Sequence, residues 1–97
     1  MPFDKFVPYT FSHTSVQKNA PASSGVYGLS NAREWIFVGE TDNIRASLLR
    51  HLAETHAPLL ERVPTGFSFE TCLSYNRAAR QERLIQEYEP VCNRHFG

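Results

Sequence analysis

Arginines able to bind phosphate recur near the end of the chain, at every third position: Arg77, Arg80 and Arg83. On a helix this spacing places the guanidinium groups on neighbouring turns, where they can form a row of cations for a phosphate backbone. Three glutamates are interleaved with them: Glu82, Glu87 and Glu89. Mixed charges of this kind more often form a solvated helix face with weak ion pairs. The sequence leaves both interpretations open.

A second pair of residues suited to chemistry is Cys92 and His95, which have the spacing of two metal ligands. A structural zinc site needs four ligands, usually from two such pairs, and the other pair is missing from the sequence. We therefore expect no zinc site here. Both cysteines, Cys72 and Cys92, are expected to be small core residues.

The net charge limits how the chain can bind nucleic acid. Its 97 residues include ten Lys and Arg and ten Asp and Glu, so the formal net charge is zero. Proteins that bind mainly through phosphates usually carry a basic excess, because each neutralised phosphate releases counterions. Contact with DNA is therefore expected to be weak and local, and a protein is an alternative partner.

The cellular location is predicted from the targeting and membrane-spanning segments that the sequence lacks. Residues 1–6 show neither a cationic start nor an apolar run, so they do not resemble a secretory signal. No stretch approaches the roughly 18 apolar residues that a membrane span requires. We predict a cytoplasmic protein that has no membrane partner and whose cysteines stay reduced.

A cluster of helix- and strand-breaking residues, 20–24, divides the chain. Residues 1–24 are predicted to form an N-terminal arm, with helical character near residues 15–18. Residues 25–97 are predicted to form the folded domain. A chain of this length is enough for one small core, so we expect a single globular unit overall.

Three strands are predicted in the folded part. Residues 26–29 and 35–38 are rich in aromatic and β-branched side chains, and residues 30–33 supply a turn between them. Two strands joined so closely must be antiparallel. The third strand is predicted where apolar and polar residues alternate, with one face formed by Phe67, Phe69, Thr71 and Leu73.

Two helices complete the predicted fold. The first is capped by Thr41 or Asp42 and ends before Pro58; its apolar stripe is formed by Ile44, Leu48, Leu49 and Leu52. The second runs over residues 76–88 and stops at Pro90, and its inner face is formed by Leu84, Ile85 and Tyr88. The order is β-β-α-β-α, which predicts a small α/β domain with a three-stranded antiparallel sheet flanked by helices.

Four pieces of sequence, taken in this order, resemble the GIY-YIG nuclease family over residues 25–93. They are Gly25-Val26-Tyr27, Phe37-Val38-Gly39, Thr41-x-Asn43-Ile44 leading into a helix that carries His51, and Leu84-Ile85 followed by Pro90 and Asn93. The resemblance implies the family's fold and the hydrolysis of DNA phosphodiesters. It implies one divalent metal held by a helix glutamate, tyrosines that activate or orient the attacking water, and an arginine that steadies the phosphate.

Transferring these roles position by position gives an uneven result. Tyr27 matches the first tyrosine, and Asn93 matches the asparagine that follows the proline. Phe37 stands where the second tyrosine belongs, and it has no oxygen to bond water or phosphate. Ser47 stands at the arginine position and Gln81 at the metal-binding glutamate. A neutral amide is a poor ligand for a hard cation where one carboxylate supplied the charge.

Neighbouring residues are candidates to replace the missing groups. Arg50 lies one turn after Ser47, and long helical side chains lean back toward the N-terminus. Glu82 stands beside Gln81, but adjacent helical residues point about 100° apart, so Glu82 would serve as the metal ligand only in a shifted register. The candidate nucleic-acid contacts are Arg45, His51, Arg77 and Arg80.

Three functions follow from these observations. The first is a GIY-YIG-fold protein with impaired cleavage that works as a nucleic-acid-binding or adaptor module without a cofactor. The second is an active DNA endonuclease that uses Mg²⁺ or Mn²⁺ with Arg50 and Glu82 as displaced catalytic groups. The third is a protein-interaction domain with no nucleic-acid role. The altered catalytic positions favour the first.

Overall fold

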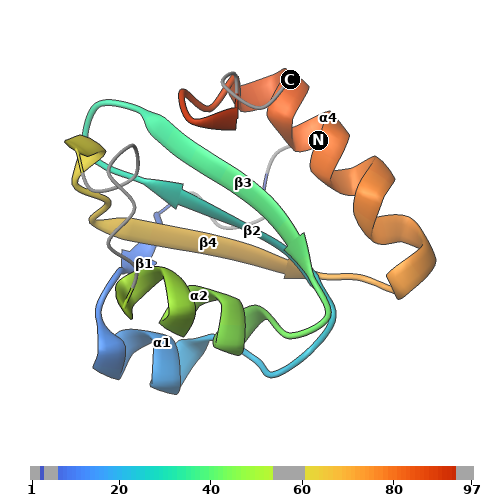
Figure 1. Ribbon diagram of the computed structural model, residues 1–97, viewed down its shortest axis with the longest axis horizontal. Helices are drawn as coiled ribbons and strands as arrows, with labels where there is room; N and C mark the ends of the chain where they lie inside the picture. Colours follow the sequence, from blue (N-terminus) through green and yellow to red (C-terminus); the bar gives the residue numbers. More distant parts are fainter. Residues whose placement is uncertain (1–2, 4–6, 54–60, 94–97) are drawn as a thin grey trace.

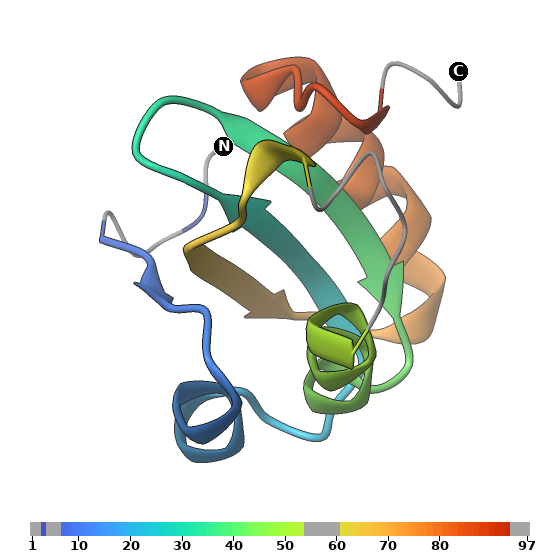
Figure 2. The ribbon, with the colours of Figure 1, turned by 60° about the vertical axis from the view of Figure 1, so that its left-hand side comes forward.

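The computed structural model describes residue 3 and residues 7–53 and 61–93. The elements follow in the order β1 (Tyr9–Thr10), α1 (His13–Asn19), β2 (Gly25–Ser30), β3 (Trp35–Thr41), α2 (Ile44–Ala53), β4 (Gly66–Thr71), a 3₁₀ turn (Ser74–Asn76) and α4 (Arg77–Tyr88). Figures 1 and 2 show α1 and α2 on one face of the sheet and α4 on the other. No helix in these described ranges is both long and apolar enough to span a membrane.

The sheet is antiparallel throughout, with strand order β1-β4-β2-β3. This confirms the predicted fold class and corrects the predicted number of strands from three to four. The additional strand, β1, comes from the arm and has only two residues, too short to produce a periodic signal in the sequence. Its Tyr9 ring stacks on Phe67 and Phe69, with ring centroids 5.3 and 5.8 Å apart.

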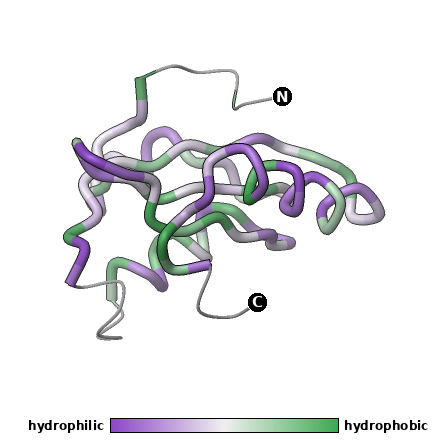
Figure 3. Tube along the Cα trace, turned by 90° about the horizontal axis from the view of Figure 1, so that it is seen from above, coloured by the Kyte–Doolittle hydropathy of each residue, from purple (hydrophilic) through white to green (hydrophobic). Residues whose placement is uncertain are grey.

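The core has two parts because side chains along a strand point alternately to opposite faces of the sheet. On one face, Tyr27 and Leu29 of β2 pack with residues of α1 and α2. On the other face, Val26 and Val38 pack with Leu84 of α4. Along the helical turns, hydrophobic and hydrophilic colours alternate in Figure 3, as expected for helices that bury one side.

Helix α2 begins at Ile44, so its capping residue is Asn43 rather than the predicted Thr41 or Asp42. The Asn43 Oδ1 accepts a hydrogen bond from the Ala46 N–H at 3.0 Å, and Thr41 Oγ1 accepts one from the Asn43 N–H at 3.1 Å. Asparagine is as good a cap as aspartate. The position was missed because three consecutive residues can all serve as caps.

Helix α4 has the predicted inner face, with Leu84 fully buried and Ile85 and Tyr88 packed beside it. Strand β4 ends at Thr71, so the prediction that Leu73 extends the strand is wrong, and its side chain is exposed. The Leu73 carbonyl instead accepts the Asn76 N–H at 2.9 Å in the 3₁₀ turn.

Candidate active site

The tyrosine and the histidine of the family-like motifs meet on the α1–α2 face of the sheet. The Tyr27 hydroxyl lies 2.8 Å from His51 Nε2 and is hydrogen-bonded to it. The Phe37 ring lies beside both, with centroids 6.1 Å from Tyr27 and 5.5 Å from His51. Tyr27 is only 3% exposed, so this bond also satisfies a buried phenol.

The two motif glycines are required by close packing. Gly39 lies opposite Tyr27 in the β2–β3 register, and a Cβ at Gly39 would be 2.6 Å from the phenol oxygen and 2.7 Å from Cζ. A Cβ at Gly25 would collide with the backbone carbonyl of Glu70. Both glycines therefore let neighbouring groups approach the strand backbone.

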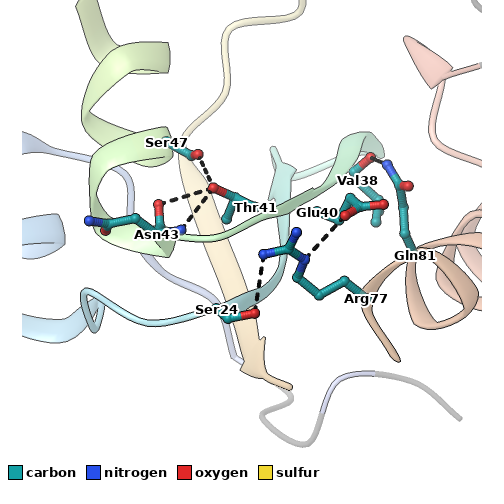
Figure 4. A network of polar contacts seen from close by, with 8 residues as sticks. All are labelled: Ser24, Val38, Glu40, Thr41, Asn43, Ser47, Arg77 and Gln81. Carbon is teal, nitrogen blue, oxygen red and sulfur yellow. Dashed lines mark hydrogen bonds and ion pairs between the residues drawn. The ribbon is translucent and has the colours of Figure 1, made fainter. Parts of the chain in front are cut away.

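Ser47, which the sequence analysis assigned to the family's arginine position, is buried and donates its hydroxyl to Thr41 Oγ1 at 2.6 Å. Figure 4 shows this contact between the first turn of α2 and the end of β3. Arg50 is exposed, and its Nη2 lies 3.5 Å from the Ser47 oxygen. Its side chain thus leans back one turn, the direction expected for a long helical side chain.

Two amide side chains hold the edge strand β3 at Val38. Asn93 accepts the Val38 N–H with Oδ1 at 2.7 Å and donates Nδ2 to the Val38 carbonyl at 3.0 Å. Gln81 Nε2 donates to the same carbonyl at 3.3 Å, which places Gln81 on the side of α4 facing the sheet. The residues before Asn93 also pair with this edge, since Val91 and Cys92 donate their N–H groups to the carbonyls of residues 35 and 36.

Replacing Asn93 by alanine is expected to lower the free energy of unfolding by about 1–3 kcal/mol, because the N–H of the buried Val38 on the edge strand loses its acceptor. Urea titration followed by circular dichroism measures the change. Asn76→Ala is the matched control: Asn76 makes no side-chain capping bond, and its replacement is expected to stay within about 0.5 kcal/mol. Equal effects of the two substitutions would contradict this role of Asn93.

Gln81, which the sequence analysis assigned to the family's metal-binding position, does not fit a divalent cation. Its amide nitrogen is directed at a carbonyl oxygen, and the amide carries no net charge. The neighbouring Glu82 is exposed to solvent. No group of three His, Cys, Asp or Glu residues that could hold a metal occurs within the described ranges.

Two arginines of α4, Arg77 and Arg80, form ion pairs with glutamates of the sheet. Arg77 Nε lies 3.2 Å from a carboxylate oxygen of Glu40 on β3. Arg80 binds Glu70 of β4 with both Nε and Nη2, at 2.7 and 2.9 Å. Glu40 and Glu70 flank Val26 in the register of the sheet, a position that the sequence analysis did not identify.

The remaining residues that the sequence analysis singled out are one arginine, the two cysteines and one histidine. Arg45 donates Nε to the Ala20 carbonyl at 2.8 Å and so ties α2 to the end of α1. Cys92 is 3% exposed, and burial raises the pKa of its thiol, as expected for a core residue. Burial also raises the pKa of the Cys72 thiol. His95 lies outside the described residues.

A cavity of about 390 Å³ lies at the β2–β3 turn, away from the motif residues. Its walls include Asn31, Arg33, Glu34 and Thr65. None of these was a candidate site residue, and an Arg62–Glu34 ion pair of 3.5 Å crosses this end of the sheet.

Comparison with known proteins identifies the fold. No protein-family model and no curated protein matches the chain. Solved structures of the GIY-YIG N-terminal endonuclease domain of UvrC from Thermotoga maritima are similar. The magnesium-bound domain has a TM-score of 0.64 and 20% identity, over 77% of this chain and 91% of that one.

Variants of the same domain give the same result. A tyrosine-to-phenylalanine variant has a TM-score of 0.64 and 21% identity, over 77% of this chain and 91% of that one. An asparagine-to-alanine variant has a TM-score of 0.64 and 20% identity, over 77% and 90%. Both are bound to the domain's catalytic divalent cation. The four-part motif order and this similarity agree: the chain has a GIY-YIG-like fold.

Proposed function

We propose that this protein is a GIY-YIG-fold module with impaired cleavage that acts by binding nucleic acid or as an adaptor. The observation that carries the proposal is Gln81, an amide at the position where the resemblance implies the metal-binding glutamate. Its nitrogen donates to the Val38 carbonyl, so the side chain takes part in holding β3. Without a carboxylate, the electrostatic stabilisation that a metal supplies to a phosphoryl transition state is missing.

The UvrC variants indicate which residues matter for the cation. In that domain the cation remains bound when a tyrosine is replaced by phenylalanine or an asparagine by alanine. By analogy, the presence of Tyr27 and Asn93 here does not argue for a metal, and the absence of a hydroxyl at Phe37 does not argue against one. The proposal therefore depends only on Gln81, which has no carboxylate at the position where the resemblance implies the metal-binding glutamate.

Weak and local contact with DNA is part of the proposal, with a protein as the alternative partner. Arg77 and Arg80 are paired with carboxylates, which reduces the charge that α4 offers to a phosphate backbone. Arg50 keeps an exposed guanidinium at the end of α2. We also propose a cytoplasmic location, in which the two free cysteines stay reduced.

An active endonuclease is the second candidate, and one observation favours it. Arg50 reaches back to Ser47, so a guanidinium is available within one turn of the family's arginine position. The same candidate needs Glu82 as its metal ligand, and Glu82 is exposed on α4 beside the inward-facing Gln81. The first function is the simpler explanation, because it does not require Arg50 and Glu82 to replace catalytic groups from neighbouring positions.

Isothermal titration with Mg²⁺ and with Mn²⁺ is expected to show no binding tighter than the millimolar range, because the site lacks a net negative charge. Gln81→Glu restores that charge and is expected to bind Mn²⁺ at least about tenfold more tightly, an effect that Glu82→Gln in the same background leaves unchanged. Micromolar affinity of the unmodified protein that is lost in Glu82→Ala would favour the endonuclease instead.

A further inference from the structure

A carboxylate at the end of β3 lies between the two helices that carry the candidate phosphate-binding groups. Glu40 follows Gly39 directly and extends toward α4, where it meets Arg77 (Figure 4). On the other side of the same strand end, Thr41 and Ser47 form the contact between β3 and α2.

The ion pair is looser than its neighbour on the same helix. Arg77 Nε lies 3.2 Å from Glu40 Oε1, yet the geometry is not that of a hydrogen bond. Arg77 Nη1 donates to Ser24 Oγ at 3.3 Å. Arg80, by contrast, donates two bonds to Glu70 at 2.7 and 2.9 Å. The contact between Arg77 and Glu40 is therefore an ion pair without a hydrogen bond. Of these two arginines, Arg80 alone forms a bidentate, hydrogen-bonded pair.

Both side chains of the looser pair are partly exposed. The Arg77 side chain is 20% exposed and that of Glu40 is 32% exposed, while the Arg77 Nε atom is itself buried and makes no hydrogen bond. A partly exposed ion pair of this kind contributes little, whereas an arginine can form two parallel hydrogen bonds to a phosphate. A phosphodiester is therefore able to replace Glu40 as the partner of Arg77 if the carboxylate moves aside.

We propose that Glu40 is an internal counter-ion that occupies Arg77 and sets the affinity of this part of the surface, between the end of β3 and α4, for phosphate-containing ligands. Binding then requires a phosphate to displace the carboxylate, so the nucleic-acid affinity of the unmodified protein is low. The inference rests on the proposed function, and it names the residue that limits that function.

The test compares Glu40→Gln, which keeps the shape of the side chain and removes its charge, with the unmodified protein. Binding of a short fluorescein-labelled DNA duplex is followed by anisotropy between about 50 and 200 mM salt. Glu40→Gln is expected to bind about tenfold more tightly at the lower salt. The slope of log K against log salt is expected to steepen by about 0.9, the value for one additional phosphate contact.

Two further variants separate this effect from a simple change of net charge. Glu87→Gln removes the same charge from the exposed face of α4 and is expected to leave the salt slope unchanged. Arg77→Gln combined with Glu40→Gln is expected to lose the gain in affinity and slope. Equal gains in Glu40→Gln and Glu87→Gln, or a gain that persists without Arg77, would overturn the inference.

A second probe distinguishes failure of the inference from failure of the proposed function. Inorganic pyrophosphate is titrated while the ¹⁵Nε resonance of Arg77 is followed by NMR. Half-saturation at a lower concentration in Glu40→Gln supports the counter-ion role even if no variant binds DNA, in which case only the nucleic-acid part of the proposed function fails. An Arg77 response that is the same with and without Glu40 overturns the inference.

Discussion

The purified protein is expected to leave plain duplex and branched DNA uncut in the presence of Mg²⁺ or Mn²⁺. At the positions that the resemblance assigns to the metal-binding glutamate and the arginine, the chain has Gln81, whose amide donates to the Val38 carbonyl, and a buried Ser47. Groups that stabilise developing charge usually dominate such catalysis, and loss of a single oxyanion-stabilising donor commonly lowers the rate about 10²–10³-fold. Gel assays of cleavage, run beside anisotropy measurements of binding, test both halves of the proposed function.

A complementary experiment introduces the family's residues at the three altered positions and measures whether cleavage appears. Phe37→Tyr, Ser47→Arg and Gln81→Glu together are expected to bring back part of the metal-dependent cleavage. Because Ser47 is buried, an arginine there is liable to disturb the start of α2. The double variant Phe37→Tyr with Gln81→Glu avoids this problem, because Arg50 then supplies the guanidinium and the same cleavage assay can be used. Metal-dependent cutting by the unmodified protein that disappears in Tyr27→Phe would show a working nuclease.

Phe67→Ala is expected to lower the free energy of unfolding by about 3–5 kcal/mol. The Phe67 side chain is fully buried, and its ring contacts the rings of Tyr9, Phe11 and Phe69, with centroids 5.3 to 6.4 Å apart. Its removal leaves a cavity between the sheet and the arm. Since the whole stability of such a domain is about 5–15 kcal/mol, much of it is lost.

Chemical unfolding of Phe67→Ala is best compared with that of Tyr75→Ala. Tyr75 is also aromatic but is 80% exposed, so its replacement is expected to change stability by no more than about 0.5 kcal/mol. Phe67→Leu fills part of the cavity and should fall between the two. A Phe67→Ala variant as stable as Tyr75→Ala would show that β1 and its aromatic contacts contribute nothing to the core.

The elements of the fold could be predicted because each carries a local pattern. The aromatic and β-branched residues of β2 and β3, the apolar–polar alternation of β4 and the helical period of α4 are read within a few residues. That period also placed Gln81 toward the sheet, where it contacts Val38. The two-residue strand β1 could not be predicted in this way, because its pairing with Phe67 depends on the rest of the sheet.

The sequence by itself determined the order of the helices and strands, the GIY-YIG-like motifs and the residue types at the positions that the resemblance assigns to the family's chemical groups. Only the tertiary structure decided which partners those residues have. Asn93 bonds to Val38, 55 positions away, and Arg77 meets Glu40 across the space between α4 and β3. These contacts depend on how α4 and the residues after it are set against the edge of the sheet. No local period encodes that placement, because it results from packing Leu84 against Val26 and Val38 in the core.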